Sequence, residues 1–455
     1  MKKVTLFVLL AGMLMAGTLD FTLHKKGKES NENVLLVIGG IQGDEPGGFN
    51  AASLLVTHYT ITKGTVWVVP NLNFFSIVER SRGPYGDMNR KFANLPASDP
   101  EYSTVERIKS IILDPRVDMV LNLHDGSGFY RTSYIDQERN PYRWGQSCII
   151  DQASIPHRRY GDLDGIAHRV QAYINDNLVD KEHRFGVKNT KTSEGDAEMA
   201  KSLTYFAIRN NKPAFGIEGS KNFGTHYRAY YHLLALERFM DEMGIEYVRN
   251  FELSPVAVKD AIDNNDIRVV MYDNKLLLPV SDARNYLHYI PMKKDATVEY
   301  RTDHPLVAVV EKDRKYRVCY GNRRMALLYP QYFEYDYSLN TIDMNVDGID
   351  KIVPLGTVVN VGNEFTIREK EGYRVNIIGF SDPSTDNEVN LLVEKSKIPQ
   401  RFSIDKSGKM YRVEIYKEDK FSGMVLVNFD DEHIQPSQTV ARVEKQDPAS
   451  TKPLF

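Results

Sequence analysis

The sequence predicts an α/β domain with a mixed, mostly parallel sheet, followed by two small all-β domains. Three observations favour this fold class. Over residues 18–244, nearly continuous apolar runs alternate with helix-like segments. After Gly244, short segments rich in Val, Ile, Tyr and Leu are separated by turn residues. The chain has 455 residues, and several domains are expected because a single core rarely grows past about 250 to 300 residues.

The strands of the first domain are expected where apolar residues follow one another without interruption, as in strands buried on both faces of a sheet. These runs span residues 33–41, 66–69, 117–123 and 213–217. Helices are expected at residues 47–59, 102–113, 162–178 and 226–243. This alternation is typical of an α/β domain, which we predict over residues 18–244.

The rest of the chain is predicted to form two small β domains. Turn pairs such as Asp382-Pro383 and Ser407-Gly408 separate its strand-like segments. A Tyr-rich stretch at 329–337 marks the seam between the two domains. We therefore predict one β domain over residues 245–335 and a second, immunoglobulin-like or barrel domain over residues 336–455.

The first 17 residues predict a secretory signal peptide. Lys2 and Lys3 precede an apolar run from Val4 to Gly17, and a basic start followed by such a run is typical of export signals. The run is shorter than the roughly 20 residues that a membrane helix needs. We expect export to the periplasm, with no stable membrane span after cleavage; the alternative is an uncleaved anchor.

Composition restricts the classes of partner and of site. The net charge of −3 provides no basic field to attract nucleic acid, so no nucleic-acid partner is expected. Cys148 and Cys319 are the only cysteines, which excludes a disulfide framework and a cysteine-based zinc site. We expect two unrelated buried thiols.

Polar residues stand at the ends of three predicted strands, where open α/β sheets collect their active sites. Gln42 and Glu45 lie between the first strand and its helix, His124 follows the strand 117–123, and Glu218 ends the strand 213–217. A catalytic zinc binds three nitrogen or oxygen ligands and keeps one position open. Gln42, Glu45 and His124 would supply these ligands. Glu218 would remain free as a general base.

These residues resemble the motif of the carboxypeptidase A-like zinc carboxypeptidases over about residues 20–244. The family pattern is His-x-x-Glu, an Asn-Arg pair, a His and a late Glu on a strand, and this chain has Gln42, Glu45, Asn89, Arg90, His124 and Glu218 in that order. The runs GGIQGDEPGGF and NLHDGSGFY are similar to those of the cell-shape-determining peptidoglycan D,L-carboxypeptidases of helical and curved Gram-negative bacteria.

The resemblance implies a function. It implies one Zn²⁺ per chain and removal of the terminal meso-diaminopimelate from peptidoglycan muramyl tripeptides, which leaves dipeptides and affects cell shape. Peptidoglycan tripeptide stems are then the expected partners, with other cell-shape proteins as further candidates. The two β domains after the catalytic domain also match this subgroup.

The resemblance also implies a substrate-binding set. Arg90 beside Asn89 matches the family's carboxylate clamp, since a guanidinium binds a free carboxylate through a planar fork. Arg82 matches the arginine that stabilises the developing oxyanion. Further candidates for the pocket are Trp144, Thr204 and Lys201, with Glu194 or Glu198 to meet the ammonium of the substrate.

Gln42 departs from the broader family, which has His at this position. A neutral amide oxygen is a poorer zinc donor than an imidazole. Two alternatives therefore stay open. One is an N-acyl amino acid deacylase of the aspartoacylase type, which shares the fold and uses similar ligands. The other is a catalytically inactive peptidoglycan-binding or scaffold protein.

Overall fold

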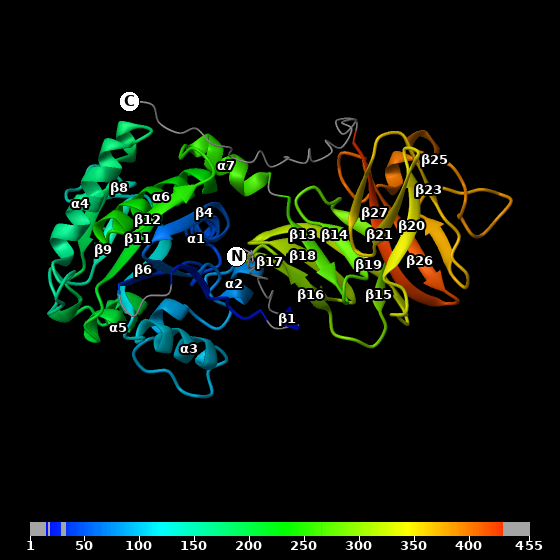
Figure 1. Ribbon diagram of the computed structural model, residues 1–455. Helices are drawn as coiled ribbons and strands as arrows, with labels where there is room; N and C mark the ends of the chain where they lie inside the picture. The colour runs from blue at the N-terminus through cyan, green and yellow to red at the C-terminus, as the bar shows by residue number, and fades with distance from the viewer. Residues whose placement is uncertain (1–14, 17–18, 29–32, 265, 431–455) are drawn as a thin grey trace, which may run out of the picture.

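The computed structural model describes residues 15–16, 19–28, 33–264 and 266–430. Figure 1 shows an elongated molecule with an α/β part at one end and groups of β-sheets toward the other. The predicted signal peptide lies outside the described residues, except that Met15–Ala16 form strand β1. No helix in the described part of the chain is long and apolar enough to cross a membrane.

A seven-stranded sheet forms the centre of the α/β part. Its strands are β2 (His24–Gly27), β3 (Val34–Ile38), β5 (Thr65–Val69), β6 (Val117–Gly126), β9 (Ser147–Ile150), β10 (Gly186–Asn189) and β11 (Ala214–Ser220). They lie in the order β10-β9-β11-β6-β3-β5-β2. The pairs β9–β11 and β5–β2 are antiparallel and the others are parallel. The predicted mixed, mostly parallel sheet is therefore confirmed.

Helices cover this sheet, and all residues of β3 and β5 are buried, as their apolar sequences predict. The four expected helices are α1 (Pro46–His58), α3 (Tyr102–Ile112), α4 (Leu163–Asp176) and α6 (Thr225–Glu242). The periodicity does not predict α2 (Phe74–Val78), α5 (Leu203–Arg209) and α7 (Pro255–Asp263), which are short. Helix α7 follows Gly244 and packs against α6. Ser254 caps its start, directly before a proline.

Two short ribbons border the α/β part. One pairs β4 (Tyr59–Lys63) with β12 (Glu246–Arg249), and the other pairs β7 (Phe129–Tyr130) with β8 (Arg139–Asn140). Cys148 and Cys319 are free and buried, as expected.

All-β structure follows α7, as predicted. The first two sheets contain β13 (Arg268–Met271), β14 (Leu276–Pro279), β15 (Tyr286–Lys293), β16 (Glu299–Thr302), β17 (Val307–Lys312), β18 (Lys315–Tyr320) and β19 (Arg323–Phe333). Their orders are β1-β16-β13-β14 and β15-β19-β18-β17. One continuous hydrophobic core joins these sheets to the α/β part.

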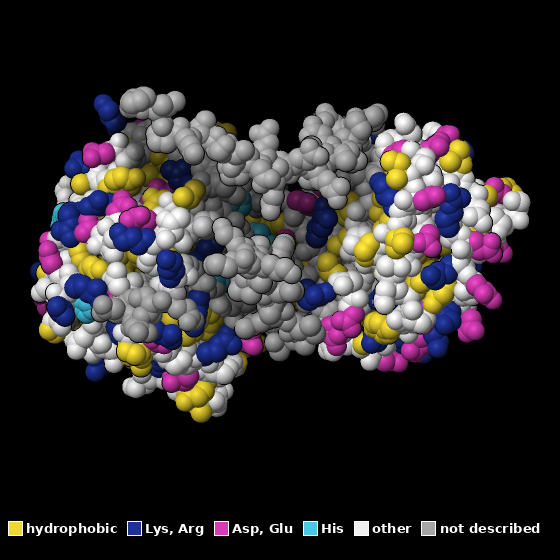
Figure 2. Space-filling view, viewed as in Figure 1, with side chains coloured by type: hydrophobic (Ala, Val, Ile, Leu, Met, Phe, Trp, Pro, Cys, Tyr) yellow, Lys and Arg dark blue, Asp and Glu magenta, His cyan; other side chains and the backbone are white. Residues whose placement is uncertain are grey.

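Two more four-stranded sheets enclose a separate core of residues between Leu339 and Phe429. Their strands are β20 (Thr341–Val346), β21 (Ile349–Pro354), β22 (Val358–Val361), β23 (Glu364–Ile367), β24 (Arg374–Ile377), β25 (Val393–Glu394), β26 (Met410–Lys417) and β27 (Lys420–Phe429). The orders are β21-β20-β23-β25 and β22-β27-β26-β24. On the face shown in Figure 2, basic and acidic side chains are interspersed, in keeping with the small net charge.

Candidate active site

The carboxyl ends of β3, β6 and β11 meet at one edge of the seven-stranded sheet. Strands β6 and β11 are parallel, and their register places His124 directly beside Glu218. Strand β3 lies on the other side of β6, and the loop after it carries Gln42 and Glu45 to the start of α1. The sheet topology thus brings these four predicted residues to one place, although they are spread over most of the α/β part.

A cavity of about 270 Å³ opens at this edge. Nine of the predicted site residues line it: Gln42, Glu45, Arg82, Asn89, Arg90, His124, Trp144, Thr204 and Glu218. Lys201, Glu194 and Glu198 do not. The 3₁₀ turn Met199–Lys201 directs Lys201 elsewhere, and its Nζ lies 2.6 Å from Glu198 Oε1. Lining residues that the sequence does not single out include Asp125, Ser127, Met199 and Lys221.

Three donor atoms converge on one point of the cavity. His124 Nδ1 lies 3.0 Å from Gln42 Oε1 and 3.0 Å from Glu45 Oε2. In a tetrahedral zinc site with bonds of about 2.0 to 2.2 Å, neighbouring ligand atoms stand about 3.3 to 3.6 Å apart. The donor set therefore fits a single metal ion after a small outward shift. No group of three His, Cys, Asp or Glu residues in the described part of the chain could hold a metal, so the Gln42 amide is needed to complete this set.

Asp87 determines which atom of the Gln42 amide faces the other donors. Its Oδ1 accepts a hydrogen bond from Gln42 Nε2 at 2.7 Å and another from the Asn89 N–H at 2.9 Å. Burial raises the pKa of Asp87, but the Arg82 charge and these hydrogen bonds outweigh it and hold the pKa below its usual range. An ionised carboxylate only accepts, so the amide nitrogen must face Asp87 and the oxygen must face His124.

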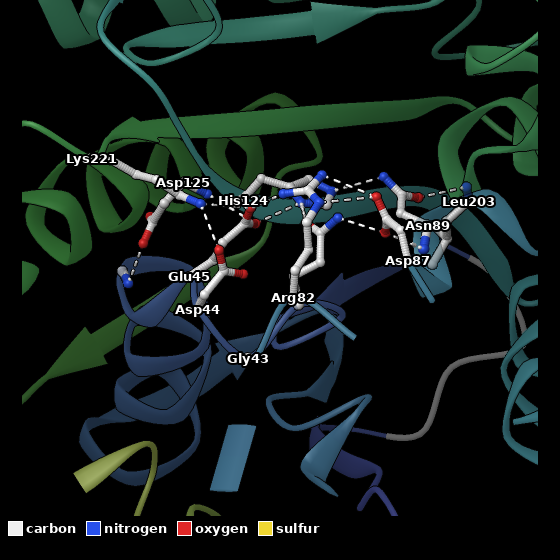
Figure 3. A network of polar contacts seen from close by, with 12 residues as sticks. Gly43, Asp44, Glu45, Arg82, Asp87, Asn89, His124, Asp125, Leu203 and Lys221 are labelled. Carbon is white, nitrogen blue, oxygen red and sulfur yellow. Dashed lines mark hydrogen bonds and ion pairs between the residues drawn. The ribbon is translucent and has the colours of Figure 1, made fainter. Parts of the chain in front are cut away.

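The one carboxylate of the donor set, Glu45, lies beside two positive charges. Figure 3 shows Glu45 and Arg82 pointing toward His124 at the centre of a polar network. Glu45 Oε1 lies 3.2 Å from Arg82 Nη1 and 3.4 Å from Lys221 Nζ, and Oε2 accepts from the Asp125 N–H at 3.2 Å. Burial lowers the pKa of His124, yet the hydrogen bond and charge of Glu45 raise it above its usual value overall.

Asp125 fixes the start of α1 behind these ligands. Its buried carboxylate accepts from the Gly47 N–H at 2.8 Å and from Arg228 Nη1 at 2.9 Å, and its Oδ1 lies 3.2 Å from His232 Nε2. Burial opposes ionisation, but His232 and Arg228 keep the pKa of Asp125 below its usual range. The network joins β6, α1 and α6, and so holds His124 and the Glu45 loop in register.

Glu218 is a carboxylate without a fixed partner. Its side chain makes no hydrogen bond within the described residues. Burial raises its pKa above the usual range, and the His124 charge opposes this only in part. A Cβ atom at Gly126 would lie 2.6 Å from the Gly145 nitrogen, 2.6 Å from the Trp144 Cβ and 2.8 Å from Glu218 Oε2, so only a glycine fits beside the carboxylate. Such a group can take up and release a proton near neutral pH.

The two arginines stand on the open side of the cavity. Arg82 has a side chain that is 51% exposed and reaches both Glu45 and Asp87. Arg90 Nη1 donates to the Asn89 carbonyl at 3.0 Å, and its Nε lies 3.7 Å from Glu198. Asn89 Oδ1 accepts from the Leu203 N–H at 3.0 Å, which ties this loop to α5.

The remaining candidates differ in position. Lys188 Nζ lies 3.9 Å from the centre of the Trp144 ring, in a cation–π contact. Thr204 is buried beside Ser202, with their hydroxyl oxygens 3.2 Å apart. Glu194 is exposed and 4.0 Å from Lys191, whereas Glu198 faces Arg90 at the mouth of the cavity. Of the two glutamates, only Glu198 contacts a residue that lines it.

Comparison with known proteins agrees with this geometry. The family described as "Carboxypeptidase controlling helical cell shape catalytic" matches residues 1–263, and the family described as "C-terminal domain of metallo-carboxypeptidase" matches residues 335–430. A search of the curated proteins found no match.

Several solved structures are similar over nearly the whole chain. The apo crystal structure of cell shape determinant protein Csd4 from Helicobacter pylori is 38% identical, covers 90% of this chain and 100% of its own, and has a TM-score of 0.86. The tripeptide-bound structure and the mDAP-bound structure, described as a D,L-carboxypeptidase, give the same values. These findings confirm the predicted resemblance and enzyme class over the deacylase and scaffold alternatives. The chain belongs to the metallocarboxypeptidase family that controls helical cell shape.

Proposed function

We propose that this chain is a zinc-dependent D,L-carboxypeptidase that removes the terminal meso-diaminopimelate from peptidoglycan muramyl tripeptides and leaves dipeptides. The observation that carries the proposal is one cavity that combines a three-donor metal site, an unpaired carboxylate and two arginines. Csd4, whose structures include tripeptide-bound and mDAP-bound forms, supports the same substrate for this chain.

The metal would be held by Gln42 Oε1, Glu45 Oε2 and His124 Nδ1. A zinc ion bound there would act as a Lewis acid that lowers the pKa of a water molecule and polarises the scissile carbonyl. Asp87 and Asp125 would keep the ligands oriented, since hydrogen bonds around a metal site fix its first ligands.

Glu218 would serve as general base and then as general acid. Its free carboxylate would take a proton from the attacking water and deliver it to the amine of departing diaminopimelate. A pKa raised by burial suits this task, because a carboxylate of ordinary pKa holds a proton too weakly to deliver it at neutral pH.

The arginines would recognise and stabilise negative charge. Arg90, positioned by Asn89, would bind the terminal carboxylate of the stem through its planar fork. Its only ionic contact in the described residues is the long one to exposed Glu198, which leaves the fork available. Arg82, next to Glu45, would stabilise the oxyanion that develops on the carbonyl. Glu198 would attract the ammonium group that meso-diaminopimelate carries at its second stereocentre.

Export to the periplasm through residues 1–17 completes the proposal, because the substrate lies in the cell wall. Other cell-shape proteins are proposed as partners on the same ground.

The proposal is tested with the purified mature chain, loaded with zinc and incubated with muramyl tripeptide, muramyl tetrapeptide or an N-acyl amino acid. We expect diaminopimelate and the dipeptide from the tripeptide alone, and no release after zinc is removed by a chelator. Cleavage of the N-acyl amino acid in place of the tripeptide would overturn the proposed substrate.

A further inference from the structure

A second cavity, of about 660 Å³, lies between the two β parts of the chain. Strands β15 and β19 form one wall, and β24, β26 and the 3₁₀ turn Gln400–Phe402 form the other. Both β15 and β24 are edge strands of their sheets. None of its lining residues belongs to the active-site cavity. Its volume is within the range of about 300 to 1,000 Å³ that is usual for ligand sites.

The charge of this cavity is strongly positive, whereas the whole chain has a net charge of −3. Four arginines and one glutamate supply its charged side chains: Arg284, Arg374, Arg401, Arg412 and Glu414. Glu414 is already neutralised, because Arg412 Nη1 lies 2.9 Å from Oε1 and the Tyr416 hydroxyl donates to Oε2 at 2.7 Å. Three guanidinium groups therefore remain without a carboxylate in the cavity.

These three arginines are held in place by neutral groups. Arg284 Nη2 donates to Ser403 Oγ at 2.7 Å and to the Gln400 carbonyl at 2.8 Å. The guanidinium of Arg374 lies over the Tyr416 ring at 4.8 Å, and that of Arg401 lies over the Phe402 ring at 5.0 Å. Within the described residues, the guanidinium groups of Arg374 and Arg401 form no hydrogen bond and no ion pair.

A bulge in β15 shapes the rim. The register of β15 shifts between Leu287 and Ile290, and Tyr289 has a φ of 54°. This left-handed conformation is unfavourable for a bulky residue and is typical of functional sites. Arg412 holds the bulge by donating to the Tyr289 carbonyl at 3.0 Å and to the His288 carbonyl at 3.2 Å. The side chains of Tyr286 and Tyr289 are consequently exposed at the mouth.

We propose that this cavity is a second peptidoglycan site, which binds free carboxylate groups of the wall polymer and holds the enzyme on its substrate. Guanidinium groups pair with carboxylates through two parallel hydrogen bonds, and exposed tyrosines supply faces for the apolar and amide parts of the ligand. In an intact wall the stem peptides carry the free carboxylates, because the lactyl carboxyl of the glycan is bound in an amide. The proposal rests on the proposed function for the nature of the polymer.

The test compares two double variants of the full mature chain. Arg374→Gln/Arg401→Gln removes two charges from the cavity, and Lys351→Gln/Lys370→Gln removes two exposed charges from the same β part outside it. Binding to purified peptidoglycan sacculi is measured by co-sedimentation. We expect the arginine pair to weaken binding about tenfold or more, from the loss of charged hydrogen bonds, and the lysine pair to change it less than about twofold. Equal binding of both variants to the sacculi would overturn the proposed second site.

Two further arms identify the ligand and separate this site from catalysis. Amidation of the carboxylates of the sacculi should remove the difference between the variants, and a persisting difference would overturn carboxylate recognition. Soluble stem peptide should compete for binding to the sacculi better than glycan strands stripped of peptide. Better competition by the stripped glycan would mean that the cavity binds the lactyl carboxylate. Cleavage of soluble tripeptide should be unchanged in both variants. If that cleavage is absent while arginine-dependent binding persists, the proposed function fails and the site stands.

Discussion

Replacing Asp87 by asparagine would test how the chain makes a glutamine serve as a metal ligand. The carboxylate accepts from Gln42 Nε2 at 2.7 Å and lies 3.0 Å from Arg82 Nη2. Asparagine has the same shape but no charge, and its amide nitrogen cannot accept. In Asp87→Asn the Gln42 amide therefore loses the ionised acceptor that turns its oxygen toward His124.

The expected magnitude follows from this one contact. A hydrogen bond to a charged group contributes about 1.5 to 3 kcal/mol, and loss of an orienting contact around a metal site typically costs about 10 to 100-fold in metal affinity. Both values predict a zinc dissociation constant that rises about 10 to 100-fold in Asp87→Asn. The fold should be retained, because Asp87 caps only the short 3₁₀ turn Met88–Arg90 and an asparagine can also cap such a turn.

The assay is competition for zinc against a chromophoric chelator. Asp164→Asn provides the control, because this carboxylate is 49% exposed on α4 and, within the described residues, pairs only with His168. The control should bind zinc as the parent chain does. Equal zinc affinity in Asp87→Asn and the parent would refute the role of Asp87 in orienting Gln42.

Three further predictions follow from the described geometry. Gln42→His should bind zinc more tightly with little loss of activity, measured by chelator competition and turnover; complete inactivation would mean that the amide has another role. Arg90→Lys should lower kcat/KM about 100-fold, mainly through KM, because lysine lacks the bidentate fork; an unchanged KM would remove Arg90 from carboxylate binding. Burial lowers the pKa of His304 to about 3, so the unfolded chain binds a proton that the folded chain excludes. Stability should fall as the pH drops from about 6.5 toward 3, by up to about 1.4 kcal/mol per pH unit. In His304→Gln, the free energy of unfolding should lack this part of its dependence on pH. The same pH dependence in the variant and the parent chain would contradict the role given to His304.

The fold class was accessible from the sequence because burial on both faces leaves a direct signal. Strands β3 and β5 are buried throughout and consist almost wholly of apolar residues. Strand β2 has the sequence HKKG and lies at the edge of the sheet, so no apolar pattern marks it. Helix α7 buries only Val258 and Ile262; its one local signal is the Ser254-Pro255 start.

The candidate site was accessible only in part. Gln42, His124 and Glu218 stand at strand ends, and parallel pairing explains why they meet. Asp87 gives no local signal, since its role depends on the loop folding back over Gln42. Closeness in sequence is also misleading for Lys201, which precedes Thr204 by three positions but turns to Glu198.

No sequence motif marks the second cavity, which the four arginines line. Arg284 and Arg412 come from different β parts, and each would be interpreted from the sequence as an ordinary surface charge. Only the packing of β15 against β26 brings them together, through the contacts of Arg412 with the β15 bulge.

The most direct test of zinc-dependent carboxypeptidase action compares the parent chain with Glu218→Gln on muramyl tripeptide. Both proteins are loaded with zinc, their metal content is measured, and released diaminopimelate is quantified by mass spectrometry. We predict equal zinc content and a loss of release of about 10² to 10⁴-fold in the variant, which is the usual contribution of a general acid–base group. Two results would contradict zinc-dependent carboxypeptidase action: undiminished release of diaminopimelate by zinc-loaded Glu218→Gln, or no release by the zinc-loaded parent chain.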